Sequence, residues 1–368
     1  MTEILNIGSE PVFDDRIVKI ETHTYNPYAN TTFDYSDEIR IPIQQQDLYT
    51  LPCESFLYVE GTLTVTRAAD QVGNVVLGTN CVAFMFDEIR YELDGMEIDR
   101  CRNVGITSTL KNYVTVSSDR SVILRNAGWE PHNNPNGYFT FYVPLNLLLG
   151  FCEDYKRVVI NARHELILIR ARNDNNSLVG SLALEPTIKI LKIQWRMPHV
   201  VLNEINKLSM LRALEDGRYL SMGFRSWDLY EYPLLQNTTK HSWAIKTAIR
   251  RLRSADGSEE CHVCRHKPIQ RLQLDQRKTL SKFGSLSGYY GYEYLEPSLT
   301  VSTFLRNGPF VIIDCSHQNE SVKNATVDVR IEFDCMENVL PNTSAYCLII
   351  HDRVIEYNPL TNVVRKII

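Results

Sequence analysis

Alternation of apolar and polar positions is the main pattern along the chain. From residue 56 to 66, Leu57, Val59, Leu63 and Val65 share one parity, and polar or aromatic residues occupy the other. Successive side chains of a strand point to opposite faces of a sheet, so this pattern predicts a half-buried strand. Residues 84–93 and 96–99 alternate in the same way around Asp94-Gly95, a dipeptide that accepts positive φ and therefore predicts a hairpin.

More strands are predicted where β-branched and aromatic residues gather between turn residues. They cover residues 138–143, 158–162, 164–172, 187–197, 219–232, 241–249, 310–315 and 327–335. The first clear helix is expected only near the middle, at 203–216, where Asn203 can cap it and Gly217 can end it.

Many short strands without regular strand-helix alternation favour antiparallel sandwiches over a parallel α/β sheet. The sequence therefore predicts an all-β fold of two consecutive jelly-roll sandwiches joined by a short helical connector. The expected organisation is an N-terminal arm (1–25), a first jelly roll (26–200), the connector (201–218) and a second jelly roll (219–368) with an atypical loop at 250–282.

The C-terminal segment stays apolar to its last residue. Strand-like runs at 345–351 and 353–357 and a turn at 358–362 lead to a final strand that holds Val363, Val364, Ile367 and Ile368. An end that packs against nothing gains little from apolar residues. We expect this strand to be covered, either by its own chain or by a neighbouring copy.

Composition narrows the class of function. The net charge of -5 gives no basic field of the kind that drives nucleic-acid binding, so DNA contact is not expected to dominate. No signal peptide and no apolar run long enough to span a membrane is found. Nine scattered cysteines, an odd number, predict buried free thiols in a reducing compartment.

Few residues suggest chemistry, and each has a plainer interpretation. Cys261 and Cys264 form a Cys-x-x-Cys pair that could share a zinc ion, but a second ligand pair is missing within the next 50 residues. Asp314 to His317 holds an acid, nucleophiles and a base, yet adjacent strand residues point to opposite faces. The four tryptophans are expected in sandwich cores. No enzyme fingerprint appears, and we expect neither catalysis nor a cofactor.

Several long segments resemble a known family. They are HTYNPYANTTFDYSDEIRIPIQQQDLYTLPCESFLYVEGTL (23–63), FDEIRYELDGMEIDR (86–100), GYFTFYVPLNLLLGFCEDYKRVVINARHELILIRAR (137–172), KIQWRMPHV (192–200), GFRSWDLYEYP (223–233), VIIDCSHQNESVKNATVDVRIEF, and the terminal HDRVIEYNPLTNVVRKI. Together they are similar to the hexon-like double jelly-roll major capsid proteins, in the branch of Maverick or Polinton elements and adintoviruses. Residues 250–282 depart from this resemblance.

The resemblance implies a structural protein of the virion. Three chains would form a pseudo-hexagonal capsomer, and capsomers would tile an icosahedral shell around a DNA genome. Implied partners are the chain itself, penton and minor capsid proteins, with synthesis in the host cytoplasm and assembly in nucleus or cytoplasm. The best candidates for assembly contacts are Tyr25, Tyr28, Val363, Val364, Ile367 and Ile368.

Two alternatives remain open at the level of sequence. A host-recruited β-sandwich that binds a glycan or a protein would keep the fold without the shell, and predicts clustered exposed aromatic residues. A metal-dependent enzyme or regulator built on Cys261 and Cys264 predicts stoichiometric zinc.

Overall fold

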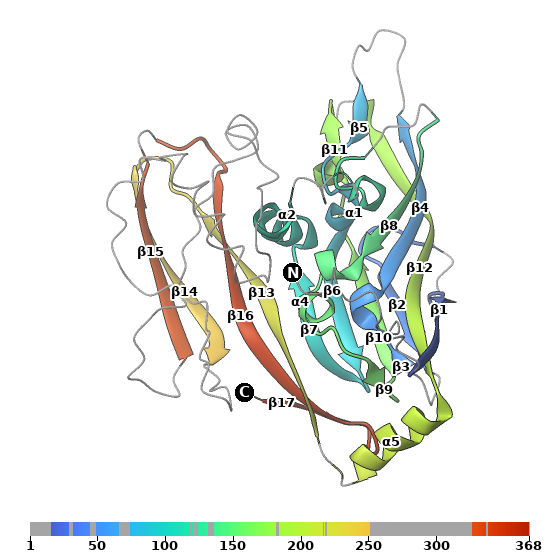
Figure 1. Cartoon of the computed structure of the whole chain (residues 1–368). Coiled ribbons are helices and arrows are strands. Elements are labelled where there is room, and N and C mark those ends of the chain that lie inside the picture. The colour runs from blue at the N-terminus through green and yellow to red at the C-terminus, as the bar shows by residue number, and fades with distance from the viewer. Residues whose placement is uncertain are drawn as a thin grey trace, which may run out of the picture.

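The structure is a computed structural model of the chain. It describes residues 16–28, 32–44, 49–65, 74–117, 120, 122, 124–131, 136–181, 184–215, 217, 219–250, 326–335 and 338–367. Two bodies built of β-sheet stand side by side, with helix α5 (Glu204–Glu215) at the lower end of the first (Figure 1).

Two sheets form the first body. The larger sheet has the order β8-β4-β12-β3-β9, and β1 pairs with β12 as well. Its strands are β1 (Ile17–Tyr25), β3 (Tyr49–Thr50), β4 (Phe56–Val65), β8 (Tyr138–Pro144), β9 (Val159–Ile160) and β12 (Pro186–Leu202). The facing sheet has the order β2-β10-β6-β7, with strands β2 (Glu38–Ile43), β10 (His164–Arg170), β6 (Phe86–Leu93) and β7 (Met96–Arg102). All these pairings are antiparallel.

The core of the first body lies between these sheets. Leu57 and Val59 of β4 are buried, while Tyr58 and Glu60 lie on the outer side, as the alternation predicts. The predicted hairpin joins β6 to β7, and Asp94 and Gly95 have φ of 49° and 78°. A small sheet of β5 (Val75–Leu77) and β11 (Leu178–Gly180) lies at one end.

The second body also has two antiparallel sheets. One has the order β13-β16-β17, formed by β13 (Leu220–Pro233), β16 (Ser344–Asn358) and β17 (Val363–Ile367). The other pairs β14 (Lys240–Arg250) with β15 (Thr326–Asp334). Trp243, Ile245, Val329 and Ile349 form a core between the sheets. This arrangement confirms the predicted all-β class and the second sandwich.

Three elements differ from the sequence-based expectation. Helix α2 (Val104–Thr115) precedes the predicted first helix. Packing of one of its faces on the core stabilises this helix and outweighs the weak helix propensity of its β-branched residues. Phe84 ends the short helix α1 (Cys81–Phe84) rather than beginning β6. The runs 345–351 and 353–357 are one strand, β16, paired along its length with β13.

Other local predictions are confirmed. Helix α5 begins where the Asn203 side chain accepts a hydrogen bond from the Ile205 N–H at 3.1 Å. Further helical turns are α4 (Gly150–Asp154) and 3-10 turns at Pro52–Glu54, Leu124–Ala127, Leu145–Leu147 and Asn175–Ser177. All four tryptophans, Trp129, Trp195, Trp227 and Trp243, are buried, and of these Trp195 and Trp243 belong to the hydrophobic cores of the two sandwiches. Among the described residues, no helix is long and apolar enough to cross a membrane.

Candidate functional site: the joint between the two sandwiches

Helix α4 places the first sandwich in direct contact with strand β13 of the second. Gly150, the first residue of α4, lies so close to Arg225 that a Cβ atom there would be 1.7 Å from the Arg225 carbonyl oxygen. No side chain fits this space unless the backbone moves. The glycine therefore permits a close backbone approach between the two bodies.

An ion pair flanks this contact. The Asp154 carboxylate accepts hydrogen bonds from the Arg225 backbone N–H and Nε, both at 2.8 Å, and from the guanidinium Nη2 at 2.5 Å. Both side chains are mostly buried, with 17% and 16% exposed. A bidentate arginine-carboxylate pair fixes orientation as well as distance, so it holds α4 in one position on β13.

Asp99 of β7 joins three elements in the same region. Its fully buried carboxylate accepts hydrogen bonds from the Phe151 N–H of α4 and from the Ser226 hydroxyl of β13, both at 2.9 Å. Burial raises the pKa of Asp99, although these donors and Arg353 favour the carboxylate. Arg353 of β16 also donates to the Ile98 carbonyl at 3.1 Å.

Helix α2 contributes a buried cation. The Lys111 side chain is 1% exposed, pairs with Glu153 and lies with its Nζ 4.6 Å from the centre of the Trp227 ring. Burial lowers the pKa of Lys111, and the charge of Glu153 opposes that shift. The carboxylate of Glu153 therefore compensates the charge of Lys111, which is buried inside the joint and not exposed to solvent.

The hydrophobic core continues across the joint. Met222 and Phe224 of β13 and Ile355 and Tyr357 of β16 belong to the same buried cluster as the core of the first sandwich. The Phe224 ring meets the Phe151 ring edge-on at 5.3 Å. A contact with this apolar content resembles a domain core and resists relative motion of the two bodies.

The C-terminal segment lies on the same joint. Tyr357 donates to the Ile160 carbonyl at 2.9 Å, and Asn161 donates to the Pro359 carbonyl at 3.0 Å. Strand β17 pairs with β16 over five residues. The chain itself therefore covers one edge of its apolar C-terminal strand, which is one of the two possibilities that the sequence left open.

The two outer faces of the first sandwich differ in chemistry. On the sheet with β6 and β7, Arg40, Arg90, Arg100 and Arg102 form ion pairs with Glu38, Glu88, Glu97 and Glu165. On the other sheet, Arg196 lies over the rings of Phe56, Tyr58 and Tyr142 at 4.9 to 5.9 Å. On the first face, arginines and glutamates compensate each other's charges. On the second face, aromatic rings lie close together around one arginine.

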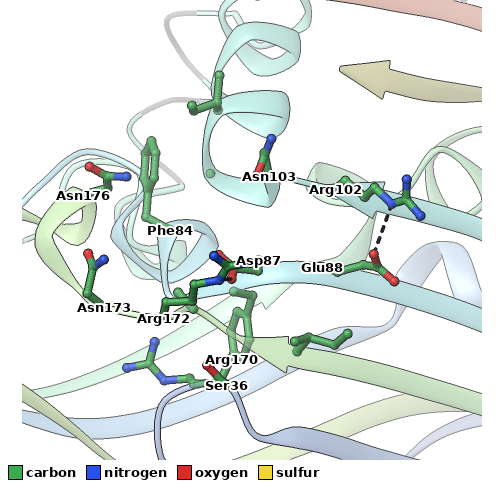
Figure 2. Close-up of a pocket in the computed structure, with 15 residues that line it drawn as sticks. Ser36, Phe84, Asp87, Glu88, Arg102, Asn103, Arg170, Arg172, Asn173 and Asn176 are labelled. Carbon is green, nitrogen blue, oxygen red and sulfur yellow. Dashed lines mark hydrogen bonds and ion pairs between the residues drawn. The ribbon is translucent and has the colours of Figure 1, made fainter. Parts of the chain in front are cut away.

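A pocket of about 790 Å³ opens between the start of β6, the N-terminus of α2 and the loop after β10 (Figure 2). Arg102 pairs with Glu88 at 3.2 Å, and Arg172 lies 4.0 Å from Asp87. The described lining contains no histidine or cysteine, and Ser36 is its one hydroxyl side chain.

The predicted assembly residues lie in different environments. Tyr25 is half-buried and bonds the His199 ring at 2.9 Å, whereas Tyr28 is 80% exposed. Val364 is buried under its own chain, while Val363 and Ile367 are 37% and 36% exposed. Ile368 lies outside the described residues. The structure therefore brings Val363, Val364 and Ile367 together on β17 and places Tyr25 and Tyr28 on the first sandwich.

Other candidates lie partly outside the structure. Cys261, Cys264 and the segment from Asp314 to His317 fall outside the described residues, as does most of the atypical loop. In the described ranges, no group of three or more metal-ligating side chains is arranged to hold an ion. Cys53, Cys81, Cys101 and Cys152 are free and buried, as predicted.

The residues of the joint carried no signal that the sequence analysis could use. Asp99, Asp154 and Arg225 look like ordinary polar residues of strands and turns, and Gly150 lies in an apolar run. Their significance depends on contacts between residues that lie 52 to 127 positions apart in the chain.

Comparison with solved structures gives the same overall arrangement of strands. PBCV-1 VP54, fitted into a cryo-EM reconstruction of the virophage Sputnik, matches with a TM-score of 0.55 at 11% identity, over 98% of this chain and 99% of that one. A chain from a cryo-EM structure of the Sputnik virophage matches with a TM-score of 0.62 at 8% identity, over 99% and 91%. The mavirus major capsid protein matches with a TM-score of 0.52 at 10% identity, over 99% and 93%.

The sequence also matches a family directly. No curated protein sequence matches the chain. The family model of the double jelly roll-like domain matches residues 75–255 and 280–355 and leaves out the centre of the atypical loop. Because these ranges cover well over half of the chain, the protein belongs to the double jelly roll-like domain family.

Proposed function

We propose that the chain is a structural major capsid protein. The observation that carries this proposal is the joint: two sandwiches are fixed to each other by Gly150, Asp154-Arg225, Asp99 and a shared core. A shell subunit has to present its two sandwiches at a constant angle, because its contacts repeat around a closed ring. The similarity in fold to the mavirus major capsid protein supports the same function.

In this proposal three chains form a pseudo-hexagonal capsomer, and capsomers tile an icosahedral shell that encloses DNA. The Maverick, Polinton and adintovirus branch is the proposed origin, and penton and minor capsid proteins are the proposed neighbours in the virion. Modest contacts suffice, since a closed shell multiplies many weak interfaces. The domain limits at 26–200 and 219–368 and the exposed β17 residues Val363 and Ile367 belong to this proposal.

Native mass tests the capsomer. Light scattering on a sizing column should give three times the chain mass of 42.4 kDa, with a hexagonal outline in negative-stain images. Val363→Asp and Ile367→Asp should lower the trimer fraction if β17 contributes to the contact. A stable monomer at every concentration would contradict the capsomer.

A second candidate function rests on the aromatic face. Tyr138 and Tyr142 are 41% and 42% exposed on the sheet that carries Tyr58 and Arg196. Exposed tyrosines beside a cation are also typical of glycan-binding or protein-binding surfaces. This alternative predicts a monomer or dimer whose binding to a glycan array is lost in Tyr142→Ala. A trimer with no glycan binding would exclude it.

A further inference from the structure

Strand β1 forms an exposed edge of the first sandwich. In Figure 1 it is the dark blue strand on the far side of that sandwich from the second one. Among the described strands it pairs only with β12. Its first eight residues are exposed on both faces, and Ile17, Val18 and Ile20 are 41%, 63% and 54% exposed. Natural proteins usually protect an edge of this length and apolar content.

Along this edge, the backbone of β1 carries hydrogen-bonding groups that have no partner among the described residues. Thr22 lies opposite Pro198, whose carbonyl faces the other side of β12 and accepts from the Leu51 N–H at 3.0 Å. Proline has no N–H, so Thr22 and Pro198 form a non-hydrogen-bonded pair, and the N–H and C=O of Thr22 point away from β12. Ile20 and Thr24 each lie two positions from Thr22 along the strand, so their backbone N–H and C=O groups also point away from β12. No backbone group among the described residues bonds to these outward groups.

The side chains around this edge are complementary to themselves. Lys19 and Glu21 flank Ile20, are about half exposed, and pair with each other at 2.6 Å. When two such strands pair antiparallel with Ile20 opposite Ile20, Lys19 of each copy lies opposite Glu21 of the other. Opposite charges in directly facing positions stabilise a strand pair.

We propose that two copies of the chain join through β1, strand to strand and antiparallel, about a two-fold axis that passes beside Ile20. The hydrogen bonds come from the outward N–H and C=O of Ile20 in each copy, which face each other in this register, and specificity comes from the two Lys19-Glu21 contacts. An isologous contact needs a self-complementary surface, and this order of residues provides one. The contact goes beyond the proposed trimer, because a two-fold contact links one capsomer to the next.

Cysteine cross-linking tests the register. In the full-length chain, Ile20→Cys places two thiols opposite each other, within the Cα distances that a disulfide allows. Under mild oxidation this variant should give a covalent dimer on a non-reducing gel, well above the wild-type background. Thr22→Cys is the matched control, because its partner in this register is Val18. No excess dimer in Ile20→Cys, or an equal or larger yield in Thr22→Cys, would overturn the proposal.

A charge exchange tests the specificity without introducing a thiol. Lys19→Glu and Glu21→Lys each place like charges opposite each other and should weaken the two-fold association by about tenfold, whereas the double exchange should restore it. Sedimentation velocity measures both this association and the mass of the smaller unit. The variants should leave a three-chain unit intact, so loss of the two-fold contact is distinguishable from failure of the capsomer. A double exchange that behaves like the single variants would contradict the proposal.

Discussion

The Asp154 carboxylate accepts three hydrogen bonds from a single residue, Arg225, which lies 71 positions later in the chain and in the other sandwich. One of these donors is the backbone N–H of β13, so the carboxylate fixes the strand as well as the side chain. The pair lies beside Gly150, where the backbones of the two bodies approach closely. The distance between the two sandwiches and their relative orientation are therefore set at the same place in the structure.

Breaking this ion pair should destabilise the chain. We expect Asp154→Asn and Arg225→Gln each to lower the free energy of unfolding by about 2 kcal/mol, less than for a fully buried pair because some solvent reaches both side chains. The double variant should cost less than the sum of the single changes. Urea unfolding of the three variants measures this, and strict additivity would show that the two residues do not interact.

The close approach at Gly150 gives a prediction with an internal control. Gly150→Ala forces the Cβ atom against the Arg225 carbonyl, so we expect a loss of about 2 to 4 kcal/mol as the backbones separate. Gly223→Ala on β13 is the control, because a Cβ atom there meets nothing within 4 Å. Its effect should stay below about 1 kcal/mol in the same urea titration. Equal effects would mean that the joint tolerates movement.

Acid should weaken the first sandwich through His164. This residue is buried between Thr50 and Tyr91, with both ring nitrogens at 2.9 Å from their hydroxyls, and burial lowers its pKa to about 3. The unfolded chain takes up the proton near pH 6.5 and the folded chain does not. Stability is therefore complete above pH 6.5 and falls by up to about 1.4 kcal/mol per pH unit between pH 6.5 and 3.

The variant His164→Gln isolates this contribution. Glutamine can still bond to a hydroxyl but does not titrate, so the variant should lose less stability than the wild type between pH 7 and 5. Urea unfolding at both pH values provides the comparison. His199, whose pKa is lowered to about 4 by burial and by His23, titrates in both proteins and contributes to the slope that remains. An unchanged slope in the variant would contradict the assignment to His164.

The buried thiols should be unreactive until the chain unfolds. Burial raises the pKa of Cys81 to about 12, and Cys81, Cys101 and Cys152 are almost completely buried. Alkylation needs the thiolate and access, so native protein should be labelled at half-buried Cys335 long before these three. Mass spectrometry of peptides after timed alkylation checks this order. Rapid labelling of Cys81 in native protein would mean that the first sandwich opens locally.

Local chemistry accounts for what could be predicted from the sequence. The parity of Leu57 and Val59, the Asp94-Gly95 turn and the capping Asn203 each act within a few residues, so strands, hairpin and connector helix followed from the pattern. The double jelly-roll class followed from the number of strands and from long segments of family resemblance.

Tertiary structure alone decided the rest. Helix α2 carries weak helix formers and exists because its inner face packs on the core, which no local pattern reports. The joint pairs Asp99 with Ser226 and Asp154 with Arg225 across 127 and 71 positions, and the open edge of β1 depends on Pro198 facing Leu51. Strand patterns fix which face of an element is buried, whereas contacts between distant elements are fixed only when the whole chain packs.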